Sequence, residues 1–382
     1  MEDKRTLLTY HDLTVEADKA PDKELLDHLH STVLGQPGGF RYQHTNLKER
    51  LSAPGENYFL YLRKSGKMLG SVGFCGKPSQ VEGKRFDSWL IRYFSIKAPM
   101  RTVPKKRTEK TELKDDSKRT TVLGRFIQPV FANPSLLRGT GEEGEGPVDQ
   151  QGPAIIYAII EQKNLRSMNF STQMGLETIG EMASFSFSRL RPSKSSRMEQ
   201  LAAEDQAGML SLLQEFYRDY TLFISNPLFR NNDYYVIREA NRVVAGLQIY
   251  HVTWRIVDIG SGPANTLLRL LSRIPWFQRR FDPERVRLLA FDGIYCEKGY
   301  ESALYELMEG ILEKTSTYLA MLMIDRSSDL FRIFETNQKL GLLHKLFGTF
   351  SADIRVRFIN MPEQIRHYFL THPTYIPTYD NS

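Results

Sequence analysis

The sequence predicts an α/β protein of the α+β kind, with two similar domains that each hold a mixed, mostly antiparallel central sheet flanked by helices. An internal repeat indicates this: YFLYLRKSGKMLGSVGF from Tyr58 and YYVIREANRVVAGLQIY from Tyr234 both read as strand, tight turn and strand. A second pair follows in the same order, IIYAIIEQKNLRSMNF from Ile155 and YLAMLMIDRSSDLF from Tyr318. The length of 382 residues suits two domains of about 150 to 200 residues each. We therefore expect two copies of one fold.

The first copy is expected to span residues 1–191. Gly66 supplies the turn of its hairpin, in which Arg63, Lys67 and Gly70 match Arg238, Arg242 and Gly246 of the second copy. The polar stretches 99–118 and 139–152 are expected to be solvated loops. The predicted elements are a strand at Thr6–Leu13, a helix from Asp22 to Leu34, the hairpin Tyr58–Cys75, a strand at Ser88–Ile96, a helix from Val122, a strand at Ile155–Ile160, a helix at Asn164–Met174 and strand structure over Leu176–Leu190.

The second copy is expected to span residues 197–361, after the linker RPSKSS. Asp205 is predicted to cap its first helix. The tail, 362–382, contains Pro373 and Pro377 and is expected to lie over the surface. The predicted elements are a strand at Met198–Ala202, a helix at Asp205–Tyr220, the hairpin Asp233–His251, strands at Trp254–Ile259 and Val286–Ile294, a helix at Tyr300–Thr315, a strand at Tyr318–Ile324, a helix at Ser328–Lys339 and a strand at Thr349–Phe358.

The composition narrows the class of protein. A net charge of +6 over the whole chain does not point to a nucleic-acid partner, but it suits an anionic small ligand. Cys75 and Cys296 are the only cysteines, and the eight histidines are scattered, so no metal is expected. No signal peptide or apolar run of membrane-spanning length occurs, so we expect a cytoplasmic protein with no membrane partner. Trp276, Phe277 and Phe281 beside arginines indicate a lid, an interface or a small local core.

The order of elements resembles the GNAT superfamily of N-acetyltransferases in a tandem arrangement. The best local match is IIYAIIEQKNLRSMNFSTQMGLETIGEMASF, which is similar to the family's strand, Asn, helix and Gly-hydrophobic unit. In it Asn164 begins the helix and Gly175 ends it, and each residue type suits its place, because Asn is a good N-cap and Gly adopts the left-handed C-cap.

The resemblance also implies a cradle for the pyrophosphate of acetyl-CoA or another acyl-CoA, which would be a co-substrate. The family places glycines at a helix N-terminus there, and the nearest stretch of this chain is RTTVLGR, with Val122 where the first glycine would stand. The backbone of the preceding strand would hold the thioester. The expected acyl-CoA contacts are Phe94, Ser95, Ile96, Arg119, Val122, Leu123, Gly124, Arg125 and Asn164.

The second copy is expected to be a degenerate one. Its corresponding stretch, CEKGYESALYELM, keeps Gly299 but has Glu301 in place of the second glycine, and a carboxylate there would repel a diphosphate.

The resemblance implies acyl transfer to an amine, which would be a small molecule or a peptide. The family's tyrosine, which protonates the leaving thiolate, would stand at Ser171, so the candidate catalytic residues are Tyr93 and Glu161. A packed aromatic and a solvated turn residue are the alternatives for these two. Two other functions stay open: a catalytically silent protein that binds acyl-CoA or a protein partner, and a transferase that takes its acyl group from charged tRNA. The oligomeric state and the acyl chain cannot be read from the sequence.

Overall fold

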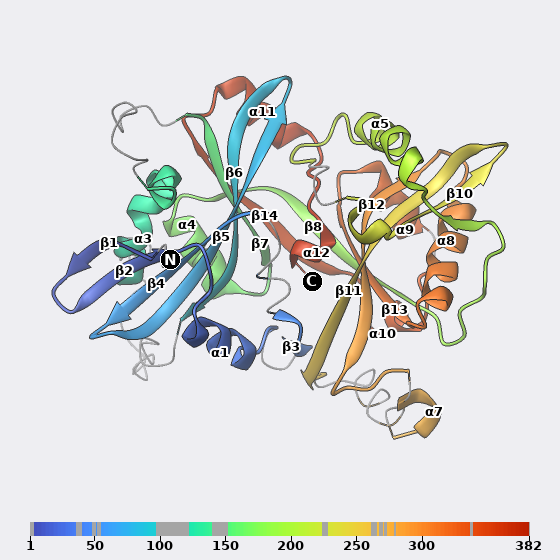
Figure 1. Cartoon of the computed structure of the whole chain (residues 1–382), viewed down its shortest axis with the longest axis horizontal. Coiled ribbons are helices and arrows are strands. Elements are labelled where there is room, and N and C mark those ends of the chain that lie inside the picture. The colour runs from blue at the N-terminus through green and yellow to red at the C-terminus, as the bar shows by residue number, and fades with distance from the viewer. Residues whose placement is uncertain are drawn as a thin grey trace, which may run out of the picture.

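The chain folds around one continuous sheet in the computed structural model (Figure 1). The structure describes residues 4–35, 40–47, 51, 55–96, 122–139, 152–223, 228–260, 266, 270, 273–278, 280–336 and 339–381. Within these residues the strands follow the order β1-β2-β4-β5-β6-β7-β14-β8-β13-β12-β11-β10-β9, and β3 pairs with β11. The pairs β6–β7 and β12–β13 are parallel, and the other pairs are antiparallel. This confirms the predicted fold class.

The first copy supplies one side of the sheet, with helices packed against it (Figure 1). Two strands stand where the sequence predicted one, because the chain turns back at residues 11 and 12. Its elements are β1 (Arg5–Tyr10), β2 (Leu13–Asp18), α1 (Lys23–Ser31), β3 (Arg41–His44), β4 (Glu56–Lys64), β5 (Lys67–Val81), β6 (Lys84–Ile96), α3 (Val122–Ala132), a 3-10 turn (Pro134–Leu137), β7 (Ala154–Glu161), α4 (Leu165–Gln173) and β8 (Glu177–Ser188).

The second copy supplies the other side and repeats the order. The second strand of the predicted hairpin and the predicted strand after it form one long strand, β11. Its elements are β9 (Met198–Gln200), α5 (Gln206–Phe216), β10 (Tyr234–Glu239), β11 (Arg242–Asp258), α7 (Pro275–Gln278), β12 (Val286–Cys296), α8 (Glu301–Lys314), β13 (Leu319–Asp325), α9 (Asp329–Thr336), α10 (Leu342–Phe347), β14 (Phe350–Ile359), α11 (Glu363–Thr371) and α12 (Thr378–Asn381), with 3-10 turns at Ala203–Asp205 and Arg230–Asn232.

The two copies exchange their last strands at the centre of the sheet. β14, from the second copy, pairs with β7 of the first, where Ala352 lies opposite Glu161. β8, from the first copy, pairs with β13 of the second, where Asp325 lies opposite Met182. Because β14 and β8 also pair with each other, each copy completes the sheet of the other.

The two hairpins have the same register. In each, the ladder shifts just before the arginine, between Leu62 and Arg63 and between Ile237 and Arg238. The register therefore matches Gly70 to Ala245. The sequence comparison had matched Gly70 to Gly246, one residue further along the chain, and that match is wrong.

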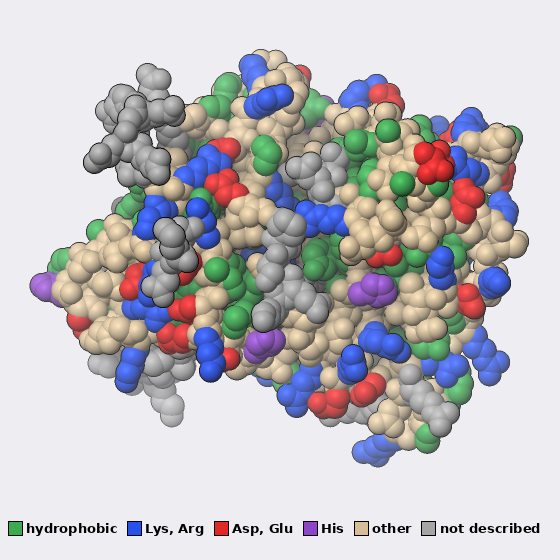
Figure 2. Space-filling view, viewed as in Figure 1, with side chains coloured by type: hydrophobic (Ala, Val, Ile, Leu, Met, Phe, Trp, Pro, Cys, Tyr) green, Lys and Arg blue, Asp and Glu red, His purple; other side chains and the backbone are tan. Residues whose placement is uncertain are grey.

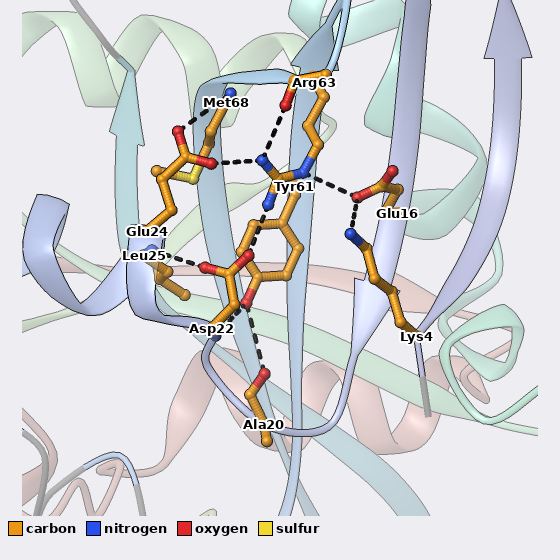
Figure 3. A network of polar contacts seen from close by, with 10 residues as sticks. Lys4, Glu16, Ala20, Asp22, Glu24, Leu25, Tyr61, Arg63 and Met68 are labelled. Carbon is orange, nitrogen blue, oxygen red and sulfur yellow. Dashed lines mark hydrogen bonds and ion pairs between the residues drawn. The ribbon is translucent and has the colours of Figure 1, made fainter. Parts of the chain in front are cut away.

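Arg63 and Arg238 have the same task in the two copies. The buried guanidinium of Arg63 binds Glu16 of β2 at 2.9 Å, and Asp22 and Glu24 at the start of α1, with Asp22 at 2.6 Å (Figure 3). Each arginine thus joins the strand that precedes the first helix of its copy to the N-terminus of that helix. Arg238 contacts Glu199 of β9 and Asp205, just before α5.

The predicted cap at Asp205 is wrong. The Asp205 side chain caps no backbone N–H, because its carboxylate binds Arg238 at 2.6 Å. In the first copy Asp22 does both, since it also accepts the N–H of Leu25.

The predicted surface tail is also wrong. Residues 363–371 form α11, and the segment after it enters the interior, where Thr374, Ile376 and Thr378 are 2%, 3% and 1% exposed. Among the described residues, no helix combines the length and the apolar character that a membrane crossing requires.

Candidate functional site

A gap opens in the sheet where β6 and β7 separate. The two parallel strands pair from Asp87 opposite Ala154 to Leu90 opposite Tyr157, and the ladder ends there although β6 continues to Ile96. Among the described residues, the groups of β6 that face β7 after Leu90 therefore have no partner strand, and such groups are open to a ligand.

A β-bulge in β6 lies at the mouth of this gap. Ser95 pairs with Ser71 and Arg92 with Gly73, so that Tyr93 and Phe94 together oppose one residue of β5. Tyr93 has a φ of +54°, which is unusual for an aromatic residue. Gly73 makes room for it, since a Cβ there would lie 3.3 Å from the Tyr93 ring.

A cavity of about 760 Å³ occupies the gap and continues between the two copies. Apolar side chains supply most of its wall. From the first copy the walls include Ile91–Ser95 of β6 and Ala158–Glu161 of β7, together with Asn164, Ser167, Phe170 and Ser171, and from the second copy Trp254, Leu319, Met321, Leu343, Phe347 and Phe350.

The predicted residues Tyr93, Phe94, Ser95, Glu161 and Asn164 all line this cavity. The Tyr93 ring packs against α1, and no hydrogen-bond partner is found for its buried hydroxyl among the described residues. Phe94 stacks on Phe170 of α4, with 4.7 Å between ring centroids. The structure thus brings together residues that lie up to 71 positions apart, from Tyr93 to Asn164.

Helix α4 begins and ends as the sequence predicted. The Asn164 side chain accepts the N–H of Ser167 at 3.2 Å, and Gly175 has a φ of +79°. Ser171, at the position where the family has tyrosine, is buried, and its hydroxyl donates to the carbonyl of Met168.

The expected phosphate cradle is described only in part. Helix α3 begins at Val122, as predicted, and Gly124 is buried in it. Arg119 lies outside the described residues. The side chains of Ile96, Val122, Leu123 and Arg125 lie outside them as well.

Sequence reasoning missed three polar residues at this site, namely Arg92, Asp380 and His28. Arg92 lies 3.5 Å from Asp380 of α12, which also pairs with Lys77, and both Arg92 and Asp380 line the cavity. On the other side, His28 Nε2 of α1 lies 2.7 Å from the Ser95 hydroxyl. No local pattern in the sequence gave a signal for these contacts, because each joins segments far apart in the sequence.

The second copy contains the same gap. β12 and β13 pair only as far as Ala290 opposite Met321, and β12 then bulges at Gly293, which has a φ of +52°. The registers match Arg92 to Asp292 and Tyr93 to Gly293.

The same registers match Glu161 to Asp325. They therefore match Asn164 to Ser328. Ser328 caps α9 by accepting the N–H of Phe331, as Asn164 caps α4.

The C-terminal segment fills the gap of the second copy. Asp292 accepts the N–H groups of Thr378 and Tyr379, and Asp325 accepts that of Thr374 at 2.8 Å. The N–H of Gly293 donates to the Tyr375 hydroxyl at 3.1 Å. About 20 Å³ of cavity is left there.

Two acidic side chains, Asp292 and Glu301, distinguish the second copy from the first. Burial raises the pKa of Asp292 to about 7, against the lowering effect of its bonds to Tyr379 and Thr378. The Glu301 carboxylate accepts the N–H of Gly299 at 3.1 Å, at the helix start where a phosphate was expected in the family pattern. In the part of the chain that the structure describes, no three His, Cys, Asp or Glu side chains gather as metal ligands.

Solved structures of N-myristoyltransferase have a similar fold. One is Saccharomyces cerevisiae N-myristoyltransferase with bound myristoyl-CoA, with a TM-score of 0.55, 10% identity, and coverage of 92% of this chain and 84% of that one. Another structure of the same yeast enzyme, with myristoyl-CoA and inhibitors, gives a TM-score of 0.52 and 12% identity, covering 92% and 81%. No family model matches the sequence, and no curated protein matches it. At this level of identity the likeness shows the fold alone, and it agrees with the predicted α/β class with a large, mostly antiparallel sheet flanked by helices.

Proposed function

We propose that this protein is an N-acyltransferase that moves an acyl group from acyl-CoA to an amine, and that its first copy holds the acyl-CoA. One observation carries the proposal. The gap between β6 and β7 is open to a cavity of about 760 Å³, whereas the matching gap of the second copy is filled by the C-terminal segment. A site that the chain fills in one copy and leaves open in the other is suited to a ligand in the open copy.

The backbone of β6 suits the thioester. At the bulge the ladder to β5 is interrupted, and beyond Leu90 the strand has no ladder to β7. Backbone N–H groups held rigidly at such a place stabilise the negative charge that develops on a carbonyl oxygen under attack. Phe94, Ser95 and Ile96 are the residues assigned to this role.

Tyr93 and Glu161 are the proposed proton carriers. The amine nitrogen attacks the thioester carbon, the carbon–sulfur bond breaks, and an amide and a CoA thiolate form. Glu161 takes the proton of the attacking amine, and the Tyr93 hydroxyl gives a proton to the thiolate. A buried hydroxyl without a partner costs about 1–3 kcal/mol, and among the described residues no partner is found for that of Tyr93.

The start of α3 is the proposed pyrophosphate cradle. A helix N-terminus offers free N–H groups and a favourable dipole to an anion, and Arg119 and Arg125 would add charge. Asn164 and the adjoining wall of α4 would complete the acyl-CoA site. A small-molecule or peptide amine would reach the thioester from the side of the second copy, where the cavity continues.

A second function is binding of acyl-CoA without transfer. It is favoured by Ser171, whose hydroxyl is committed to a backbone carbonyl and leaves the family's usual acid missing. The two functions differ in thiol release: a transferase frees CoA thiol when it meets its amine, and a sensor does not.

The test is calorimetry with acetyl-CoA, with a long-chain acyl-CoA and with CoA, followed by thiol release over a panel of amines and N-terminal peptides. We expect binding by the wild type and strong loss in Gly124→Glu, with Gln128→Glu on the exposed face of the same helix as the charge-matched control. Absence of binding by all three ligands would refute the proposal, and binding without thiol release would favour the sensor.

A further inference from the structure

An insert separates β11 from β12 in the second copy. In the first copy the matching strands β5 and β6 are joined by the two-residue turn Glu82–Gly83, whereas residues 259–285 stand between β11 and β12. The insert carries α7, which lies at the periphery beyond the lower end of β11 (Figure 1). A connection of this length is not needed to join two antiparallel strands.

The apolar side chains of the insert that the structure describes divide between the interior and the surface. Phe277 and Phe281 are buried in a cluster with Trp254 and Leu288. Ile274 is 47% exposed and Trp276 39%. Of the ten exposed large apolar residues in the described part of the chain, four lie on the insert or on the adjoining strand β11: Val257, Leu270, Ile274 and Trp276. Such grouping marks a contact surface.

Arginines accompany these apolar side chains. Residues 259–285 contain five arginines and two acidic residues, so they supply +3 of the net charge of +6. The guanidinium of Arg280 lies 4.1 Å from the centre of the Trp276 ring, and that of Arg191 lies 5.9 Å from it. On the face of the molecule that Figure 2 shows, many Lys and Arg side chains lie beside Asp and Glu side chains. Both acidic residues of the insert are engaged locally, since Glu284 pairs with Arg255 and Asp282 accepts the N–H of Glu284.

We propose that Val257, Leu270, Ile274 and Trp276, together with the exposed Arg191 and Arg273, form a docking surface for a membrane whose lipids are anionic. Aliphatic side chains enter the acyl boundary, tryptophan prefers the interface, and arginine binds the headgroups. Docking of this kind needs no membrane-spanning helix. It departs from the expectation of no membrane partner, which rested on the lack of an apolar run of spanning length.

The docking surface is joined to the large cavity. Phe277 and Phe281 of the insert belong to the same apolar cluster as Trp254, Leu319 and Leu343, which line the cavity. A molecule with an acyl chain that resides in the membrane would thus approach close to the cavity. The docking itself does not depend on the proposed acyl transfer and is tested without it.

The experiment uses the full chain with vesicles of phosphatidylcholine alone or mixed with phosphatidylserine, in cosedimentation and in tryptophan fluorescence. Trp89 and Trp254 are buried, so Trp276 is the exposed member of the three tryptophans. We expect binding to the mixed vesicles with a blue shift of emission, little binding to phosphatidylcholine, and loss of binding at high salt. Trp276→Phe should bind but remove the shift.

Ile274→Glu should weaken vesicle binding about tenfold or more. The substitution replaces an aliphatic side chain that would enter the membrane with a negative charge that anionic lipid repels. Leu370→Glu is the matched control, since Leu370 on α11 is also 47% exposed, and it should bind as the wild type does. Circular dichroism and thermal unfolding show whether both variants are folded. Equal binding by both variants, no binding to mixed vesicles, or binding to heparin or RNA but not to vesicles would overturn the proposal.

Discussion

The two gaps of this molecule have the same architecture and different contents. In each gap the ladder between two parallel strands ends, two unpaired positions follow, and then a bulge begins. The first residue of the bulge has a positive φ, and it is Tyr93 in one copy and Gly293 in the other. The second gap holds residues 374–378, and the first holds a cavity. Unpaired strand groups need partners. A duplicated site can thus become structural when the chain itself supplies those partners, and the other copy is then left for a ligand.

The residues at matching positions are the sharpest point of this comparison. Glu161→Gln is expected to lower kcat by about 10² to 10⁴ with little change in unfolding free energy, because it removes a proton acceptor that faces the cavity. Asp325→Asn should do the opposite: it weakens a buried acceptor of the Thr374 N–H and costs about 1–3 kcal/mol, as measured by urea unfolding. A catalytic loss in Asp325→Asn that equals that of Glu161→Gln, at unchanged stability, would contradict the division of roles.

The filled gap should depend on the segment that fills it. Tyr375→Ala is expected to destabilise the protein by about 3–5 kcal/mol, since a buried aromatic ring is lost and the N–H of Gly293 is left without its acceptor. Phe94→Ala, at the open gap, should cost less in stability and weaken acyl-CoA binding. Denaturant unfolding measures the first effect and calorimetry the second. Near-wild-type stability of Tyr375→Ala would show that the C-terminal segment does not stabilise the second gap.

The paired arginines compare the two copies away from the gaps. Removal of Arg63, whose side chain is 8% exposed among three carboxylates, is expected to cost about 3 kcal/mol because partly buried acids lose their partner. Arg238 is 28% exposed and its two partners about half exposed, so Arg238→Ala should cost below about 1 kcal/mol. Thermal or urea unfolding of Arg63→Ala and Arg238→Ala measures both. Equal costs would mean that burial of the network contributes nothing.

The Asp292 carboxyl should make the stability of the protein depend on pH at the second gap. The first gap has Arg92 at the matching position and lacks this dependence. The folded pKa of Asp292, about 7, exceeds the ordinary value of 3.8, so its contribution to stability is fully present below pH 3.8 and is lost as the pH rises to 7. Over that range the folded state binds the extra proton, and the slope is at most about 1.4 kcal/mol per pH unit. Unfolding curves of wild type and Asp292→Asn from pH 5 to 8 should therefore differ in slope, the wild type losing stability faster. Parallel curves would place the pKa of Asp292 near its usual value.

Local patterns in the sequence sufficed for the elements and for half of the candidate site. The hairpins, the Asn164 cap and the Gly175 turn depend on neighbouring residues, and the strands that they position carry Tyr93, Phe94, Ser95 and Glu161 to one cavity. The domain limits and the catalytic and acyl-CoA roles of these residues stay predictions.

Long-range partners could not be predicted from local patterns. The exchange of β8 and β14 depends on pairings between strands of different copies. The pair of Arg92 with Asp380 and the burial of residues 374–378 join segments that no periodicity relates. Two prolines made the tail resemble a surface segment, although its Tyr375 and Ile376 are core residues.

Hydrogen exchange with and without an acyl-CoA tests the central claim most directly, because it reports on both gaps in one sample. The account predicts that acyl-CoA slows exchange of backbone N–H groups in residues 91–96 and 158–161 of the first copy. It also predicts no change in residues 291–296 and 322–325, whose gap the C-terminal segment occupies. Protection of the second set, or of neither set at a saturating concentration of acyl-CoA, would contradict it.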